Sequence, residues 1–240
     1  MLRRAAGWLS LLLLAVAPPP ASAMTMQAAG DQMVLSGPVR PGDGQRFREL
    51  LAANPGVRTV ILRDSPGGDA ASGYEIGEHI RQKGLRTALS GYCRSSCSRM
   101  FLGGVERGFT DEQRAGKTYV AFHGNYEESG QLMARMVPVL QQWIVTHSDG
   151  KADPALVERW TTLPDRAGFA YFFDSERLRR RDRVSIFLCD GSESRTNRYE
   201  QCEKIAGRTG YDLGIFTPMP LLKVHPDLGY DPSTANDPDD

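Results

Sequence analysis

The sequence has no excess of charge of either sign. Its 240 residues contain 29 Lys and Arg and 29 Asp and Glu. The first 23 residues hold two of the basic side chains and none of the acidic ones, which leaves 27 basic against 29 acidic residues after them. Nucleic-acid-binding domains usually carry a surplus of positive charge. A chain this close to neutral therefore argues against a nucleic-acid partner.

The sequence also lacks a hydrophobic run long enough to cross a bilayer, which requires roughly 18 or more apolar residues. The apolar run at residues 8–17 is shorter, follows Arg3 and Arg4, and precedes the small residues Ala21 and Ala23. This order is typical of a signal peptide, here cleaved near Ala23. We therefore expect an exported protein, periplasmic or secreted. An uncleaved N-terminal anchor is the alternative.

The remaining length and apolar content fit one domain with a core of its own. We expect residues 1–23 to be the signal peptide, 24–31 a flexible N-terminus and 32–217 the domain. The prolines and acidic residues of 218–240 predict an extended and then disordered acidic tail.

Cysteine is scarce as well, with only Cys93, Cys97, Cys189 and Cys202. In an exported chain four cysteines indicate two disulfides. We predict that Cys189 pairs with Cys202, which closes a polar loop. The pair Cys93 and Cys97 requires that Cys93 precede a helix whose first turn holds Cys97. A zinc site is the alternative, but these spacings are unusual for zinc ligands, so no metal is expected.

The apolar pattern predicts an α/β fold. Residues 32–39 predict a short apolar strand and residues 57–64 a buried parallel strand, and residues 44–54 carry apolar side chains at helical spacing between them. A strand, a helix and a strand in this order make a βαβ unit. Further helices are predicted at residues 70–83, 96–103, 131–147 and 155–160, and further strands at residues 85–90, 117–123 and 184–189.

Residues suited to catalysis follow three of the predicted strands. Gly67 and Gly68 follow the second strand, Ser95 follows the third, and His123 ends the fourth. Paired glycines leave N–H groups open to a ligand at a helix start, and a serine at a strand-to-helix turn can be an exposed nucleophile. In open α/β sheets, sites form at the carboxyl ends of the strands. The sequence therefore predicts a site at this edge.

This order of elements and motifs resembles the proteolytic subunit of Clp protease and the wider Clp/crotonase superfamily. The resemblance rests on LSGPV, VILRDSPGG, the turn GYCRSS and a strand that ends in histidine. It implies repeated ββα or βαβ units that form a mainly parallel sheet with flanking helices. It also implies that Ser95 is the nucleophile, that His123 is the general base, and that the N–H groups of Gly68 and Ser96 form the oxyanion hole.

The family's catalytic aspartate lies after the histidine, before the last helix and strand of the core. Asp165 and Asp174 are the two candidates in that part of the sequence. Residues 172–178 look like the start of the family's late helix, which the aspartate precedes, so Asp165 is preferred. Asp174 is the alternative acid, although its position before Ser175 and Glu176 also fits a helix cap.

The resemblance implies an exported serine hydrolase that acts as a peptidase on peptide or protein substrates and needs no cofactor. The small residues around the family's nucleophile are replaced here by Cys93, Arg94, Cys97 and Arg99. This replacement changes the floor of the expected substrate channel. No ATP-driven unfoldase is expected as a partner, because the sequence shows no adaptor features and an exported protein would find little ATP.

A catalytically silent binding or scaffold module of the cell envelope is the second hypothesis. In that case His123 is a strand-end histidine bonded to the backbone, and the serines form a polar helix start. Relatives with this fold usually assemble through the helices after the histidine. The resemblance therefore also implies a homo-oligomer, with residues 131–147 as its contact surface.

Overall fold

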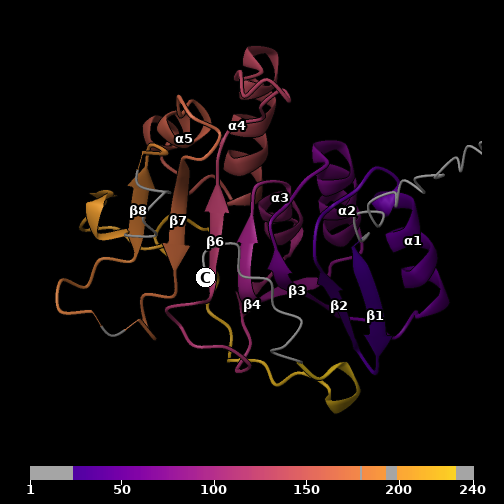
Figure 1. Ribbon diagram of the computed structural model, residues 1–240. Helices are drawn as coiled ribbons and strands as arrows, with labels where there is room; N and C mark the ends of the chain where they lie inside the picture. The colour runs from indigo at the N-terminus through magenta and orange to yellow at the C-terminus, as the bar shows by residue number, and fades with distance from the viewer. Residues whose placement is uncertain (1–23, 179, 193–198, 231–240) are drawn as a thin grey trace, which may run out of the picture.

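A mixed nine-stranded β-sheet forms the centre of the protein, and helices pack on it (Figure 1). The computed structural model describes residues 24–178, 180–192 and 199–230, so the predicted signal peptide and residues 231–240 lie outside it. The strands are β1 (Thr25–Ala29), β2 (Gln32–Ser36), β3 (Thr59–Ser65), β4 (Arg86–Arg94), β5 (Arg107–Phe109), β6 (Tyr119–Phe122), β7 (Phe169–Phe173), β8 (Ile186–Cys189) and β9 (Glu203–Lys204). The α-helices are α1 (Asp43–Ala53), α2 (Ala70–Gln82), α3 (Ser96–Gly103), α4 (Val137–His147) and α5 (Pro154–Thr161).

The strand order is β1-β2-β3-β4-β6-β7-β8-β9, with β5 paired to β4. The middle strands β2, β3, β4 and β6 run parallel, whereas β1 and β7 to β9 run antiparallel to their neighbours. The helices α1 and α2 connect β2 to β3 and β3 to β4, which confirms the predicted α/β class and its βαβ units. The carboxyl ends of β3, β4 and β6 consequently meet at one edge.

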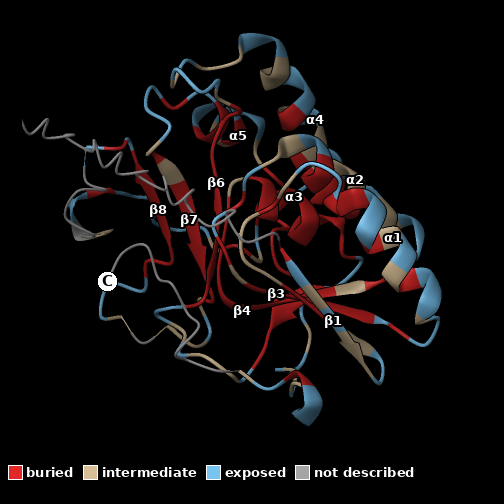
Figure 2. Ribbon diagram, turned by 45° about the vertical axis from the view of Figure 1, so that its right-hand side comes forward, coloured by how far each residue is buried: buried red, intermediate tan, exposed pale blue. Residues whose placement is uncertain are grey.

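The parallel strands are buried on both faces, as their β-branched and apolar composition predicts. In β3, Val60 and Leu62 join the main core under the helices, while Ile61 points to the other face. Figure 2 shows this burial, with red strands and outer helix faces that are exposed. The opposite face is covered in part by residues 218–230. Leu228 packs there on Ile61, and its carbonyl accepts a hydrogen bond from Arg63 at 2.7 Å.

Helices α2 and α3 lie in direct backbone contact. A Cβ atom added to Gly77 would lie 2.5 Å from the carbonyl oxygen of Arg99, and one added to Gly103 would lie 2.2 Å from the carbonyl oxygen of Gly77. Real Cβ contacts are not this short, so both positions require glycine. This contact fixes the axis of α3, the helix that starts directly after Ser95.

The structure corrects two expectations from the sequence. The stretch 24–31 was expected to be flexible, but it forms strand β1, whose Met26 pairs with Leu35 of β2, and Met24 is buried in the core. Residues 172–178 were expected to begin a helix, but Phe172 and Phe173 end β7, whose aromatic run FAYFF suits a strand buried between β6 and β8, and residues 174–178 form a turn. Within the described ranges, no helix combines the length and the apolar character that a membrane span requires.

Candidate active site

Ser95 lies at the turn between β4 and α3 with φ 54° and ψ −123°. A non-glycine residue seldom adopts this backbone conformation, which is typical of the sharp turns that expose a nucleophile. Three hydrogen bonds hold the turn. The N–H of Ser95 donates to the Ala121 carbonyl at 3.1 Å, and its own carbonyl accepts from the N–H and the hydroxyl of Ser98 at 2.9 and 2.6 Å. The Ser98 side chain thus supports the turn.

Gly67 packs closely against the turn that Arg94, Ser95 and Ser96 form. A Cβ atom there would lie 2.5 Å from the carbonyl oxygen of Arg94, 2.7 Å from the Cβ of Ser95 and 2.9 Å from the N of Ser96. The φ of Gly67 is also 84°, in the left-handed region that glycine tolerates. The first glycine of the pair therefore lets the β3–α2 loop approach the Ser95 turn.

A disulfide spans the same turn. Cys93 at the end of β4 and Cys97 in the first turn of α3 are joined at bonding distance, and both are fully buried. The second bond joins Cys189 of β8 to Cys202, directly before β9. Both pairs are those predicted from the sequence. The first ties together the two elements that position Ser95.

His123 directly follows β6, and its ring lies against Ser95. The Nε2 atom is 2.7 Å from Ser95 Oγ, and the Nδ1 atom is 3.0 Å from the carbonyl oxygen of Arg166. Since a carbonyl only accepts, Nδ1 carries the proton and Nε2 is left to accept the serine hydroxyl. The ring of Phe169 stacks on the imidazole at 4.1 Å between centroids. Ser95 and His123 are therefore held in the arrangement of a nucleophile and its general base.

Neither candidate aspartate bonds to this histidine. The side chain of Asp165 is exposed and accepts a hydrogen bond from the N–H of Ala167 at 2.9 Å. Asp174 follows β7, whose last residue pairs with Tyr119 at the start of β6. Asp174 is thus about five residues along the strand from His123, or roughly 16 Å at about 3.3 Å per residue. It accepts instead from the N–H of Glu176 and the hydroxyl of Tyr211.

A buried cation lies behind the histidine. Arg99 is 1% exposed and donates to the carbonyl oxygen of His123 at 3.1 Å and to Oδ1 of Asn125 at 3.2 Å. Among the described residues it has no carboxylate partner. Burial of the ring, followed by the charge of Arg99, lowers the pKa of His123 to about 3. The imidazole is therefore neutral at neutral pH and in mild acid.

Two backbone N–H groups beside the serine are without an acceptor in the part of the chain that the structure describes. They belong to Gly68, in the loop after β3, and to Ser96, the first residue of α3. An N–H at the first position of a helix has no partner within the helix. Such groups stabilise negative charge on a reacting oxygen when they point at it. These are the two groups that the sequence predicts for the oxyanion hole.

An open cleft of about 930 Å³ runs past Ser95 and His123. One wall comes from Arg40 and the start of α2, and the other comes from the loop 124–128 and Met133. The volume is within the usual range of about 300–1,000 Å³ for ligand sites. Charged side chains of both signs line it, among them Arg40, Asp69, Glu127, Glu128 and Arg166. The lining therefore has no strong excess of charge of either sign.

The sequence did not reveal that the carbonyl of Arg166 contacts His123, nor that Arg99 donates to His123 and Asn125. The Arg166 contact uses a main-chain carbonyl, so no residue type could reveal it. Arg99 gave a signal, because it stands where the resembling family has small residues, but its contacts with His123 and Asn125 depend on the fold.

The chain matches no protein-family model and no curated protein. Solved structures are similar to it at low identity. The membrane-bound stomatin-specific protease 1510-N, solved as a mutant, has a TM-score of 0.41 at 14% identity, covering 56% of this chain and 72% of that one. ClpP1 from Listeria monocytogenes has a TM-score of 0.41 at 14% identity, covering 54% of this chain and 77% of that one. A mutant of ClpP1 reaches 0.43 at 13% identity over 55% of this chain.

Proposed function

We propose that this protein is a serine-type peptidase whose nucleophile is Ser95 and whose general base is His123. The observation that carries the proposal is the 2.7 Å contact between Nε2 and Oγ, made by a serine in a strained turn. His123 takes the serine proton as Oγ attacks the carbonyl carbon of the substrate, and then gives it to the leaving amine. The N–H groups of Gly68 and Ser96 stabilise the tetrahedral oxyanion.

In this proposal a main-chain carbonyl takes the place of the usual catalytic carboxylate. The carbonyl of Arg166 fixes the ring and its tautomer, as an aspartate does in a triad. It supplies a partial charge rather than a full one, and Arg99 adds a positive charge nearby. The imidazolium formed during reaction is therefore stabilised less than in a triad, and we expect slow acylation.

We further propose that the chain acts outside the cytoplasm on peptide or protein substrates. Two disulfides fit an oxidising compartment, and the N-terminal sequence has the order of a signal peptide. A homo-oligomer through residues 131–147 is part of the same proposal. In α4 the side chain of Val139 is 49% exposed, which leaves apolar surface for a partner copy.

A fluorophosphonate probe tests the catalytic proposal without knowledge of the substrate. We expect one covalent adduct on folded residues 24–240 with intact disulfides, mapped by mass spectrometry to Ser95. Protein unfolded in denaturant is the control and should give no adduct. An adduct on another residue, or none on the folded protein, contradicts the proposal.

The second candidate function is a module that binds peptides without cleaving them. The observation that favours it is the low pKa of His123, about 3, which makes the ring a weak base. This candidate predicts that peptides bind in the cleft while the fluorophosphonate leaves Ser95 unmodified.

A further inference from the structure

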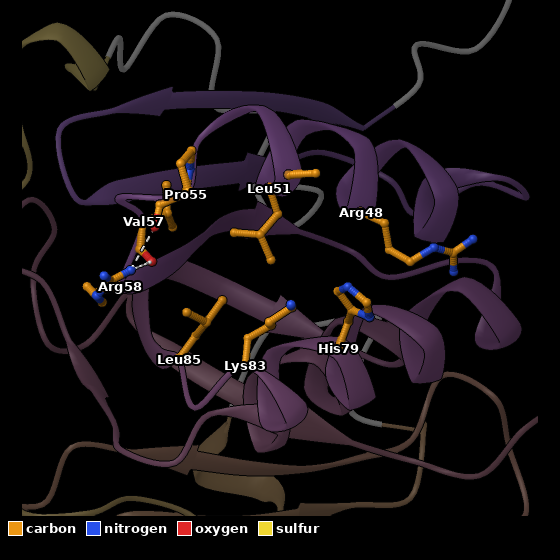
Figure 3. Close-up of a pocket in the computed structure, with 9 residues that line it drawn as sticks. Arg48, Leu51, Pro55, Val57, Arg58, His79, Lys83 and Leu85 are labelled. Carbon is orange, nitrogen blue, oxygen red and sulfur yellow. Dashed lines mark hydrogen bonds between the residues drawn. The ribbon is translucent and has the colours of Figure 1, made fainter.

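A second pocket, of about 380 Å³, lies between α1 and α2 (Figure 3). It is lined by Arg48, Leu51, Ala52, Pro55, Val57, Arg58, His79, Lys83 and Leu85. Val57 lies two residues before β3 and Leu85 directly precedes β4, so the pocket lies at the amino ends of these strands. The cleft with Ser95 lies at their carboxyl ends, and the two sites have no lining residue in common.

The floor of this pocket is apolar. Leu51, Val57 and Leu85 are buried and belong to the main core. Figure 3 shows that Leu51 comes from α1 and Leu85 from the other side of the pocket, where both point into the space between the helices. A ligand that enters the pocket therefore meets hydrocarbon, and burial of apolar surface favours binding by roughly 25 cal/mol per Å².

The rim of the pocket is cationic, and no aspartate or glutamate lines it. Arg48 forms an ion pair with Glu75, which offsets its charge. Arg58 donates to the carbonyl oxygens of Pro55 and Val57 at 2.9 and 3.0 Å. Within the described residues, neither Arg58 nor Lys83 has a carboxylate at ion-pair distance.

The C-terminus of α2 accounts for part of this charge. Lys83 is the C-cap residue of that helix, and a cation there is stabilised by the helix dipole, equivalent to roughly half a negative charge. Half a charge does not offset both Lys83 and Arg58. The helix dipole also does not explain why an apolar pocket lies beside Lys83 and Arg58. A modest positive potential therefore remains over an apolar floor.

We infer that this pocket binds a small amphipathic carboxylate, with its apolar body on Leu51, Val57 and Leu85 and its carboxylate at Lys83. A single carboxylate suits the remaining charge, because one ammonium group and one already engaged guanidinium make a weak site for a phosphate dianion. A neutral apolar molecule would offer the exposed ammonium of Lys83 no charge to pair with. The inference is independent of the activity proposed for Ser95.

Calorimetric titration with octanoate, compared with octanamide, tests the inference on residues 24–240. We expect saturable one-to-one binding of octanoate and clearly weaker binding of octanamide, which has the same chain but no charge. Lys83→Met should weaken octanoate binding by about fivefold, the effect of one partly exposed ion pair. The matched control Lys151→Met, which removes an exposed lysine outside the pocket, should leave the affinity unchanged.

A pair of variants on α1 separates the pocket from other surfaces. Ala52 lines the pocket and Ala53 does not, although both are exposed. Ala52→Phe fills the space and should abolish saturable binding, while Ala53→Phe should bind octanoate as the natural chain does. Equal binding of octanamide and octanoate, unchanged binding in Ala52→Phe, or no saturation at about 10 mM octanoate would each overturn the inference.

Discussion

Replacement of Ser95 by alanine is expected to lower kcat/KM by about 10⁴-fold or more, the loss typical when a catalytic nucleophile is removed. The side-chain hydroxyl is the group of Ser95 that attacks the substrate in the proposed reaction, and Nε2 of His123 lies 2.7 Å from its oxygen. The backbone turn itself should survive, because its hydrogen bonds use main-chain atoms of Ser95. Hydrolysis of an activated p-nitrophenyl ester or a fluorogenic peptide measures the effect.

The neighbouring serine supplies the matched control. Ser96 is proposed to act through its backbone N–H, and its buried hydroxyl has no hydrogen-bond partner in the described part of the chain. Ser96→Ala keeps that N–H and should retain activity within about threefold, an expectation for a side chain outside the reaction. A large loss of activity in Ser96→Ala with little loss in Ser95→Ala would contradict the proposal that Ser95 is the nucleophile.

The second large effect is on pH dependence. Because burial and Arg99 lower the pKa of His123 from 6.5 to about 3, the base stays unprotonated in mild acid. We expect the rate of fluorophosphonate labelling to be flat from about pH 7.5 down to about pH 4.5. A histidine with its ordinary pKa would lose roughly a hundredfold over that range. An acid limb near pH 6.5 would contradict the buried, neutral ring.

The same shift makes stability depend on pH. Between the unfolded pKa of 6.5 and the folded value of about 3, the unfolded chain binds a proton at His123 that the native chain does not. The free energy of unfolding therefore falls as the pH drops through this window, by an amount on the order of 4 kcal/mol at its lower end. His123→Gln should remove this part of the slope. Urea unfolding of both proteins at several pH values measures it, and equal slopes would refute it.

Much of the fold could be predicted because the helix and strand patterns in the sequence agree with the way the strands pair in the sheet. The parallel strands carry β-branched runs, and helix α2 has its Asp69 cap and apolar spacing, so these elements were found within a few residues. Strand β1 was missed because it is short and polar on one side, and its order comes from pairing with β2. The end of strand β7, Phe172 and Phe173, was assigned to a helix start because of a resemblance rather than because of its aromatic residues.

The sequence likewise predicts some residues of the candidate site and not others. Ser95, His123 and Gly68 could be placed together because strand ends of a parallel sheet converge at one edge, and the structure brings them to one cleft. Asp165 was preferred to Asp174 as the acid, but neither bonds to His123, since antiparallel β7 decides where each one lies. The partner of His123 is a carbonyl, which no sequence pattern encodes.

The central claim is that a main-chain carbonyl, and not an aspartate, orients His123. The most direct test is the second-order rate of fluorophosphonate labelling in Asp165→Asn and in Asp174→Asn, with folding of each variant checked by circular dichroism. Asn at position 165 can still accept from the N–H of Ala167, so the loop is preserved. We predict rates within about twofold of the natural chain, whereas loss of a triad aspartate would lower the rate by about 10⁴-fold and would contradict the claim.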